Sequence, residues 1–403
     1  MRRALLHRIC LPLAITLALA SAHLTGQAAA DVASQRQTAL ALEQQGKNVE
    51  AEAAWRLYLK AHPSNPEPYA HLGLLEARQE HYAEAAPLYR KALALNPAIP
   101  GLQLNLGLAL FKGGELKQAI VEFKSLLKSQ GPASAEGQRL TILIGMAHYG
   151  LAEYAEAVPY LQQAAVRDTQ NLPLRLALAH CCLWSRQFQC VVNTNHEILS
   201  LNAESAEADM LVGEALDEMK DRNGAIEQFR AALKVNPQTP DAHFSLGYVL
   251  WVLKQYPEAA SEFQAELDNN PNHAQAMTYL ADVDLQLSQA EAALPLLEKT
   301  IKLDSEQELA HLDLGILYAG AGRQDDALRE MKEAERLAPE DVDVHWRLGR
   351  LYRTMGRKDE AKAEFEKASQ VNKAADQALF DKINNARAHP PQAQPPAPES
   401  PVK

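Results

Sequence analysis

Three histidines recur at one phase of a regular spacing, and they are the first candidates for chemistry. His243, His311 and His345 lie 68 and 34 residues apart. Imidazole nitrogens are common zinc ligands, but a metal site requires its ligands to converge on one ion. Side chains that recur with the period of a repeat lie on successive elements along a stack. We therefore interpret these histidines as structural and predict no metal site.

Three cysteines are the next candidates, at Cys181, Cys182 and Cys190. Adjacent cysteines rarely satisfy disulfide geometry, whereas Cys182 and Cys190 fall near the end of one expected helix and the start of the next. We hypothesise a Cys182–Cys190 disulfide that holds this hairpin together. The alternative is three buried thiols that pack as small apolar side chains. No C-x-x-C motif is present, so redox catalysis is not expected.

No sequence motif for catalysis is present. The chain lacks G-x-S-x-G, the Walker loop, H-E-x-x-H and the dinucleotide fingerprint. Carboxylates are plentiful, but no pattern pairs two of them in a cleft. We therefore expect a protein that is not an enzyme and holds no cofactor.

The elements that position these residues are marked by small side chains that recur at regular intervals, a pattern that we call the ladder. Its steps are 34 or 68 residues, apart from one of 38, and the glycines that mark it are Gly73, Gly107, Gly145, Gly213, Gly247, Gly315 and Gly349. Twelve residues after each comes an alanine, and four residues later a large apolar side chain. Such spacing predicts pairs of closely packed helices, in which the large side chain fills the space beside the small ones.

This pattern resembles the tetratricopeptide repeat, which places Gly or Ala at position 8 of a 34-residue unit, Ala at 20, an aromatic residue at 24 and Pro at 32. The best match is 66–99, with Tyr69, Leu72, Gly73, Ala85, Tyr89, Ala92 and Pro97. Ten units are expected over 32–375, starting at 32, 66, 100, 138, 172, 206, 240, 274, 308 and 342. The resemblance implies an all-α, right-handed α-solenoid. The four extra residues fall near 130–137, a Gly/Ser/Pro-rich stretch that predicts a longer loop.

The two ends of the chain differ from the repeats. Residues 1–30 combine Arg2, Arg3 and Arg8 with an apolar run at 9–20 and three alanines at 28–30, which is typical of an export signal peptide. Cleavage after Ala22 and a retained anchor are the alternatives. Residues 376–388 are expected to form a capping helix with an apolar stripe. The Pro-rich residues 389–403 are expected to be a disordered tail.

Composition narrows the class of partner. The formal net charge is −11, and removal of residues 1–30 would leave 37 basic and 51 acidic residues, a net charge of −14. An acidic surface repels phosphate backbones, so nucleic acid is not an expected partner. The apolar run at 9–20 is shorter than the roughly 20 residues of a membrane span, and no later run is longer. We expect a periplasmic or secreted protein of undetermined oligomeric state.

The resemblance also implies a binding surface. First helices of the units line a concave face, with positions 2, 5, 9, 12 and 13 pointing into it. The expected partner-binding residues are Phe111, Tyr149, Trp184, Glu214, Asp217, Phe244, Tyr248, Trp251, Trp346, Arg350 and Arg353. Large side chains here favour a groove for a partner, although some of them could instead pack between adjacent helices.

These features favour a scaffold that binds a peptide or a helical segment of another protein on its concave face. Some relatives bind a C-terminal carboxylate there through Lys and Asn, but the equivalent positions here are apolar: Ala70, Leu74, Leu104 and Leu108. Two alternatives share the same architecture: an assembly factor of the cell envelope for a secretion, pilus or polysaccharide system, and a non-catalytic subunit of an enzyme complex.

Overall fold

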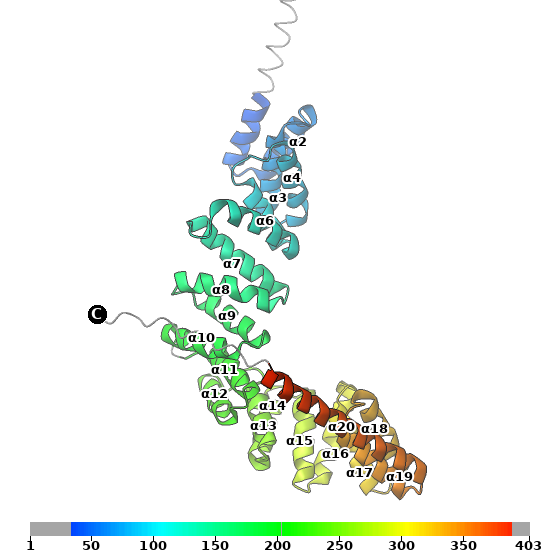
Figure 1. Ribbon diagram of the computed structural model, residues 1–403. Coiled ribbons are helices and arrows are strands. Elements are labelled where there is room, and N and C mark those ends of the chain that lie inside the picture. Colours follow the sequence, from blue (N-terminus) through cyan, green and yellow to red (C-terminus); the bar gives the residue numbers. More distant parts are fainter. Residues whose placement is uncertain (1–33, 203, 389–403) are drawn as a thin grey trace, which may run out of the picture. The chain divides into compact units, whose positions relative to one another are not determined.

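The computed structural model describes residues 34–202 and 204–388, with side chains up to residue 378. Helices joined by short turns make up these residues, and none of them lies in a β-strand (Figure 1). The expected all-α fold is confirmed. The predicted signal peptide at 1–30 and the Pro-rich tail at 389–403 lie outside the described residues.

The helices pair into ten hairpins within the described residues. The first hairpin joins helical residues 34–44 to α2 (Asn48–Ala61). The next four are α3 (Pro66–Arg78) with α4 (Tyr82–Leu95), α5 (Leu102–Lys112) with α6 (Leu116–Gln130), α7 (Ala135–Gly150) with α8 (Tyr154–Arg167), and α9 (Leu172–Trp184) with α10 (Phe188–Leu201). The last five are α11 (Ala206–Glu218) with α12 (Arg222–Val235), α13 (Ala242–Val252) with α14 (Tyr256–Asn269), α15 (Ala274–Gln286) with α16 (Ala290–Leu303), α17 (Glu308–Gly320) with α18 (Gln324–Leu337), and α19 (Val342–Thr354) with α20 (Lys358–Ala388).

The hairpins belong to two compact units, residues 1–203 and 204–403. Within each unit a helix contacts its neighbours in sequence, and the first helices of adjacent hairpins also touch. The boundary follows the fifth hairpin, whose residues depart from the ladder: Val191 stands in place of the alanine and Asn195 in place of the large apolar residue. The sequence predicted one array of ten units and did not predict this division.

The small residue at position 8 and the large one at position 24 pack directly on each other. Phe229 on α12 is 2% exposed, and a Cβ placed on Gly213 of α11 would lie 2.5 Å from its Cε1 atom. The same relation joins Gly145 to Leu161 and Gly315 to Met331. Glycine is therefore required at these positions by the close approach of the two helices, as the ladder predicted.

The turn inside each hairpin contains one residue in the left-handed region, at position 15. Four units place glycine there, and the others place a residue with a side chain, such as Glu80 (φ 63°) or Lys220 (φ 68°). The following backbone N–H bonds back into the first helix, as in His81 N to Glu76 O at 3.0 Å. This bond satisfies a carbonyl at the helix end and fixes the angle between the two helices.

The recurring histidines connect the two helices of their own hairpin. Each Nδ1 atom lies within hydrogen-bond distance of a glutamate 19 residues later, in the pairs His243–Glu262, His311–Glu330 and His345–Glu364. His311 also bonds the Ser305 carbonyl through Nε2 at 3.1 Å, in the turn before its helix. Both ring nitrogens of His311 therefore face an acceptor oxygen, one on Glu330 and one on Ser305. These hydrogen bonds join the two helices of each hairpin.

The last helix differs from the prediction of a separate capping helix at 376–388. α20 runs without interruption from Lys358 to Ala388, so these residues continue the second helix of the tenth hairpin. The reason lies in the sequence, because no glycine or proline occurs between Lys358 and Pro390. Position 32 of this unit is Lys373, where five other units have the proline that stops a helix.

Cys182 and Cys190 are joined by a disulfide, with their Cα atoms 5.8 Å apart across the turn between α9 and α10. The bond ties together the hairpin that departs most from the ladder. Cys181 is a free thiol, fully buried, and burial raises its pKa to about 12. A thiol with so high a pKa is a poor nucleophile at neutral pH, so Cys181 acts as a small core residue.

A thiol count on the denatured protein checks this bond. The chain has four cysteines, so the full-length protein should show two free thiols before reduction, Cys10 and Cys181, and four after it. Peptide mapping should place Cys182 and Cys190 in one linked pair. Four free thiols in the unreduced protein would contradict the disulfide.

Candidate functional site

The predicted partner-binding residues lie in both units, so each part is described by itself. In the first unit the structure brings Tyr149 of α7 and Trp184 of α9 together around Tyr154 and His180. The Tyr154 ring lies 6.1 Å from both the Tyr149 and the Trp184 rings, and His180 lies 5.7 Å from Tyr149. Trp184 is 61% exposed. Phe111 does not join this cluster, because its ring packs 6.3 Å from the buried Phe123 of its own hairpin.

In the second unit Phe244, Tyr248 and Trp251 of α13 form one cluster with Tyr279 of α15, which we call the Trp251 cluster. Ring centroids lie 5.9 Å apart for Tyr248 and Trp251, and 5.0 Å apart for Trp251 and Tyr279. All four side chains are half-buried, and Phe244, Trp251 and Tyr279 pack on the core below them. The phenol of Tyr279, which the sequence did not single out, has a pKa raised to about 12 by burial and by Tyr248, Asp282 and Glu308.

A carboxylate fixes the orientation of this cluster. Trp251 Nε1 donates a hydrogen bond of 2.5 Å to Asp282 Oδ2, on the neighbouring helix α15. Asp282 is 6% exposed and also accepts a bond from Gln286. The indole ring is therefore held with its N–H edge toward Asp282.

A second carboxylate, on α17, is buried without a hydrogen-bond partner for one of its oxygens. Asp313 is 3% exposed, and its Oδ2 atom has no partner among the described residues. Burial and the negative charge of Asp282 hold the pKa of Asp313 well above its usual value, and Arg347 only partly offsets them. Burial and the charges of Asp341 and Asp343 raise the pKa of Glu308 as well.

The two acidic residues predicted on α11 have different surroundings. Glu214 is exposed to solvent. Its pKa is raised by partial removal from water and by the negative charge of Asp241. Asp217 is bound by Arg222 of the following helix in an ion pair. Burial still raises the pKa of Asp217 in spite of Arg222. Only Glu214 thus offers its carboxylate outward.

The predicted residues of α19 do not form one site. Trp346 is 50% exposed and its ring packs 4.9 Å from Phe365 of α20. Arg350 lines a hollow of about 210 Å³ between α17 and α19, together with Ile316 and Arg347. Arg353 lies instead beside α20, near Phe365. The two arginines therefore border different surfaces.

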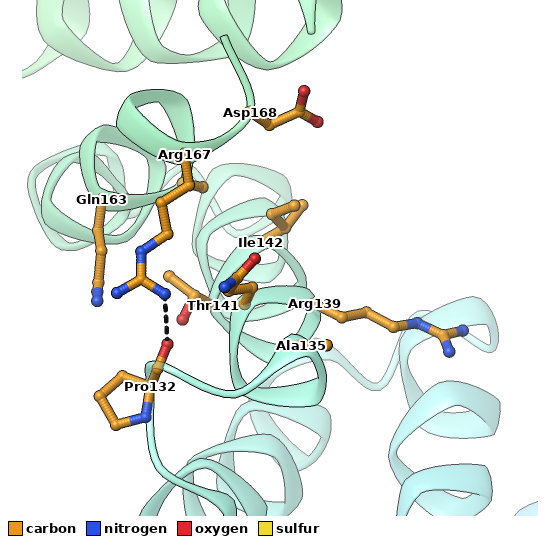
Figure 2. A pocket seen from close by; sticks show the side chains of 10 residues that line it. Pro132, Ala135, Arg139, Thr141, Ile142, Gln163, Arg167 and Asp168 are labelled. Carbon is orange, nitrogen blue, oxygen red and sulfur yellow. Dashed lines mark hydrogen bonds between the residues drawn. The ribbon is translucent and has the colours of Figure 1, made fainter. Parts of the chain in front are cut away.

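A larger hollow, of about 390 Å³, lies where the four extra residues enter the chain. Figure 2 shows Arg167 of α8 reaching to the loop, where it donates a 3.0 Å bond to the Pro132 carbonyl. Arg139 points away from this bond and is exposed. The Gly/Ser/Pro-rich stretch predicted the loop but not the hollow beside it.

Two groups of residues have the composition of metal sites, and both are occupied by bonds within the chain. Glu335, His345 and Glu364 gather on α18, α19 and α20. Lys332 and Lys367 each bridge both carboxylates, at 2.6 to 3.3 Å. Although burial acts to raise the pKa of Glu364, hydrogen bonds from His345 and Lys367 and the charge of Lys332 lower it. This group is an ion-pair network.

The other group is Asp241, Glu266 and His273. Ala276 N donates to His273 Nδ1 at 3.1 Å, so the Nε2 atom carries the proton and faces Asp241 Oδ1 at 3.1 Å. Glu266 accepts from the Phe244 backbone at 3.2 Å. These side chains cap helices and hold loops in place.

Similarity to known proteins indicates the family of this chain. Two models of the tetratricopeptide repeat match residues 71–135, 210–274 and 278–342, and residues 318–379, which together span more than half of the chain. No curated protein matches the sequence significantly. Among the described residues, no helix has both the length and the apolar character required to cross a membrane.

Several solved structures are similar in fold. YrrB, described as a TPR protein with an unusual peptide-binding site, is 22% identical and covers 47% of this chain and 97% of its own, with a TM-score of 0.38. MamA from Desulfovibrio magneticus RS-1 is 22% identical over 42% of this chain and 96% of its own, with a TM-score of 0.37. A tetratricopeptide repeat protein from Parabacteroides merdae is 16% identical over 66% and 97%, with a TM-score of 0.47.

Proposed function

Since the chain belongs to the tetratricopeptide repeat family, we propose that it is a non-catalytic scaffold that binds a peptide or helical segment of another protein. The binding face is the one lined by the first helices of the hairpins. The observation that carries this proposal is the Trp251 cluster, in which aromatic rings from α13 and α15 meet and remain half-exposed. Aromatic side chains with polar tips, held rigid by their neighbours, are the residues that dominate binding energy at protein interfaces.

A hairpin stack supports this function physically. Neighbouring hairpins hold the first helices side by side, so the rings of α13 and α15 lie in a row from one helix to the next. An amphipathic segment placed along such a row buries one apolar face. The half-exposed rings of Tyr248 and Tyr279 contribute apolar area without needing to change conformation, which lowers the entropic cost of binding.

The test uses an array of short peptides of varied composition and the full-length protein. Peptides that bind should lose about tenfold in affinity when Tyr248 is changed to alanine. Leu303→Ala is the matched control, because Leu303 is a 48% exposed apolar residue at the end of the second helix α16. Far-UV circular dichroism should be the same for all three proteins. The proposal fails if no peptide binds, or if Tyr248→Ala binds as well as the unchanged chain.

We also propose that the protein is exported. The support is the sequence of residues 1–30, with its basic start and short apolar run. Export would place the Cys182–Cys190 pair in an oxidising compartment, where disulfides persist. Native protein that retains Met1 after purification from cells would contradict this proposal.

A further inference from the structure

Carboxylates lie beneath the Trp251 cluster in the second unit. Asp282 on α15 accepts a hydrogen bond from the Trp251 N–H. The negative charge of Asp282 also raises the pKa of Asp313 on α17. The negative charge of Glu308 on α17 likewise raises the pKa of Tyr279. Carboxylates on α15 and α17 therefore lie within electrostatic range of the aromatic rings or of one another.

Within the described residues, the surroundings of the Asp313 carboxylate offset its charge only in part. Its Oδ2 atom is buried without a hydrogen-bond partner, although nearly all buried polar atoms in proteins have one. Among the described residues, the basic group whose charge lowers its pKa is Arg347, which is itself bound to Asp343 at 3.2 Å. Burial and Asp282 oppose ionisation of the Asp313 carboxyl in the free protein, so a cation supplied from outside would favour its ionised form and gain a charged partner.

The aromatic rings favour the same kind of ligand. The faces of Trp and Tyr rings attract Arg and Lys cations, most strongly where water is partly excluded. Tyr248, Trp251 and Tyr279 are half-buried and lie within 5.0 to 5.9 Å of one another. The hydrogen bond to Asp282 fixes the Trp251 ring, so the rings and the carboxylates are already arranged before a ligand arrives.

We propose that the Trp251 cluster together with Asp282 and Asp313 binds a basic side chain of the partner segment, arginine in preference to lysine. This proposal rests on the proposed function and adds the chemistry of the partner. A guanidinium is planar, stacks on an aromatic ring and offers several N–H donors to carboxylate oxygens. The net charge of −11 would also attract a basic segment before contact. The partner is therefore a peptide segment with arginine among apolar residues.

The experiment uses pools of short peptides that are random except for one central residue: arginine, lysine, citrulline or glutamate. Citrulline has the shape of arginine but no charge. Binding to the full-length protein is measured by fluorescence polarisation. We expect the arginine pool to bind about tenfold more tightly than the citrulline pool, and this difference to fall below about threefold in Asp313→Asn. Glu227→Gln, an exposed acid on the second helix α12, removes the same charge and should leave the difference unchanged.

A second measurement separates this role from a structural one. Without peptide, Asp313→Asn should raise the melting temperature, because it removes a buried carboxyl whose ionisation is opposed by burial and by Asp282. If instead Asp313→Asn lowers the melting temperature and leaves binding unchanged, the carboxylate is structural and the proposal is wrong. Equal binding of the arginine and citrulline pools would overturn it and leave the proposed function standing, provided that Tyr248→Ala weakens both. If no pool binds, the proposed function fails with it.

Discussion

Replacing Phe229 with alanine is expected to lower the free energy of unfolding by about 3–5 kcal/mol. The ring is 2% exposed and fills the space against Gly213, so its removal leaves a cavity that two closely packed helices cannot close. Urea denaturation followed by circular dichroism measures the change. Val235→Ala, on the same helix but 39% exposed, is the control and should change stability by less than about 1 kcal/mol.

A pair of substitutions tests whether the contact itself is responsible. Gly213→Ala alone should destabilise the protein by about 1–3 kcal/mol, because its Cβ would meet the ring. In combination with Phe229→Leu the cost should be smaller than the sum of the single changes, since another hairpin has alanine and leucine at these two positions, the fully buried Ala281 and Leu297. Strictly additive effects would show that positions 8 and 24 are not coupled.

Replacing Arg175 with methionine should lower the free energy of unfolding by about 2–4 kcal/mol. Arg175 is 4% exposed and donates to the carbonyls of Asp168 (3.0 Å) and Ala165 (3.2 Å), and to Glu197 (3.0 Å). Methionine keeps much of the volume but leaves the two carbonyls at the end of α8 without these donors. Most of the cost is expected from them, because Glu197 is largely exposed and its ion pair is screened.

Hydrogen exchange shows where this effect is located. Arg175→Met should speed exchange at the end of α8 and the start of α9, and leave the second unit unchanged, since helices contact only near neighbours within a unit. Arg139→Met is the matched control, because Arg139 is exposed on α7. Equal stability of the two variants would mean that the buried hydrogen bonds contribute little.

The repeat ladder predicts most of the fold because it records the contacts that recur. Gly213 and Phe229 touch, as do the equivalent residues in other hairpins, so their spacing alone gives the helix pairs and their order. The left-handed turn at position 15 was not predictable in the same way. Six units use residues such as Glu80 and Lys220 there, and these side chains carry no signature of a positive φ. The histidine–glutamate pairs were not predicted either, since the two residues of each pair lie 19 residues apart on different helices.

The candidate site was predicted only in part. Tyr248 and Trp251 were expected on the face of the first helices, and the structure brings them together with Tyr279. Tyr279 and Asp313 both stand at position 6, outside the positions that the family places in the groove. Their contribution depends on how α13, α15 and α17 pack against one another. The sequence periodicity of a single helix does not predict this packing.

Contacts limited to near neighbours give the chain a distinctive response to mechanical load. If the ends of one unit were pulled apart, hairpins would detach one after another, because no distant segment of that unit holds them. Each detached hairpin of about 34 residues would release about 110 Å of extended chain. The disulfide between Cys182 and Cys190 would shorten that release in the fifth hairpin, so reducing agents would lengthen one step and leave the others as they were.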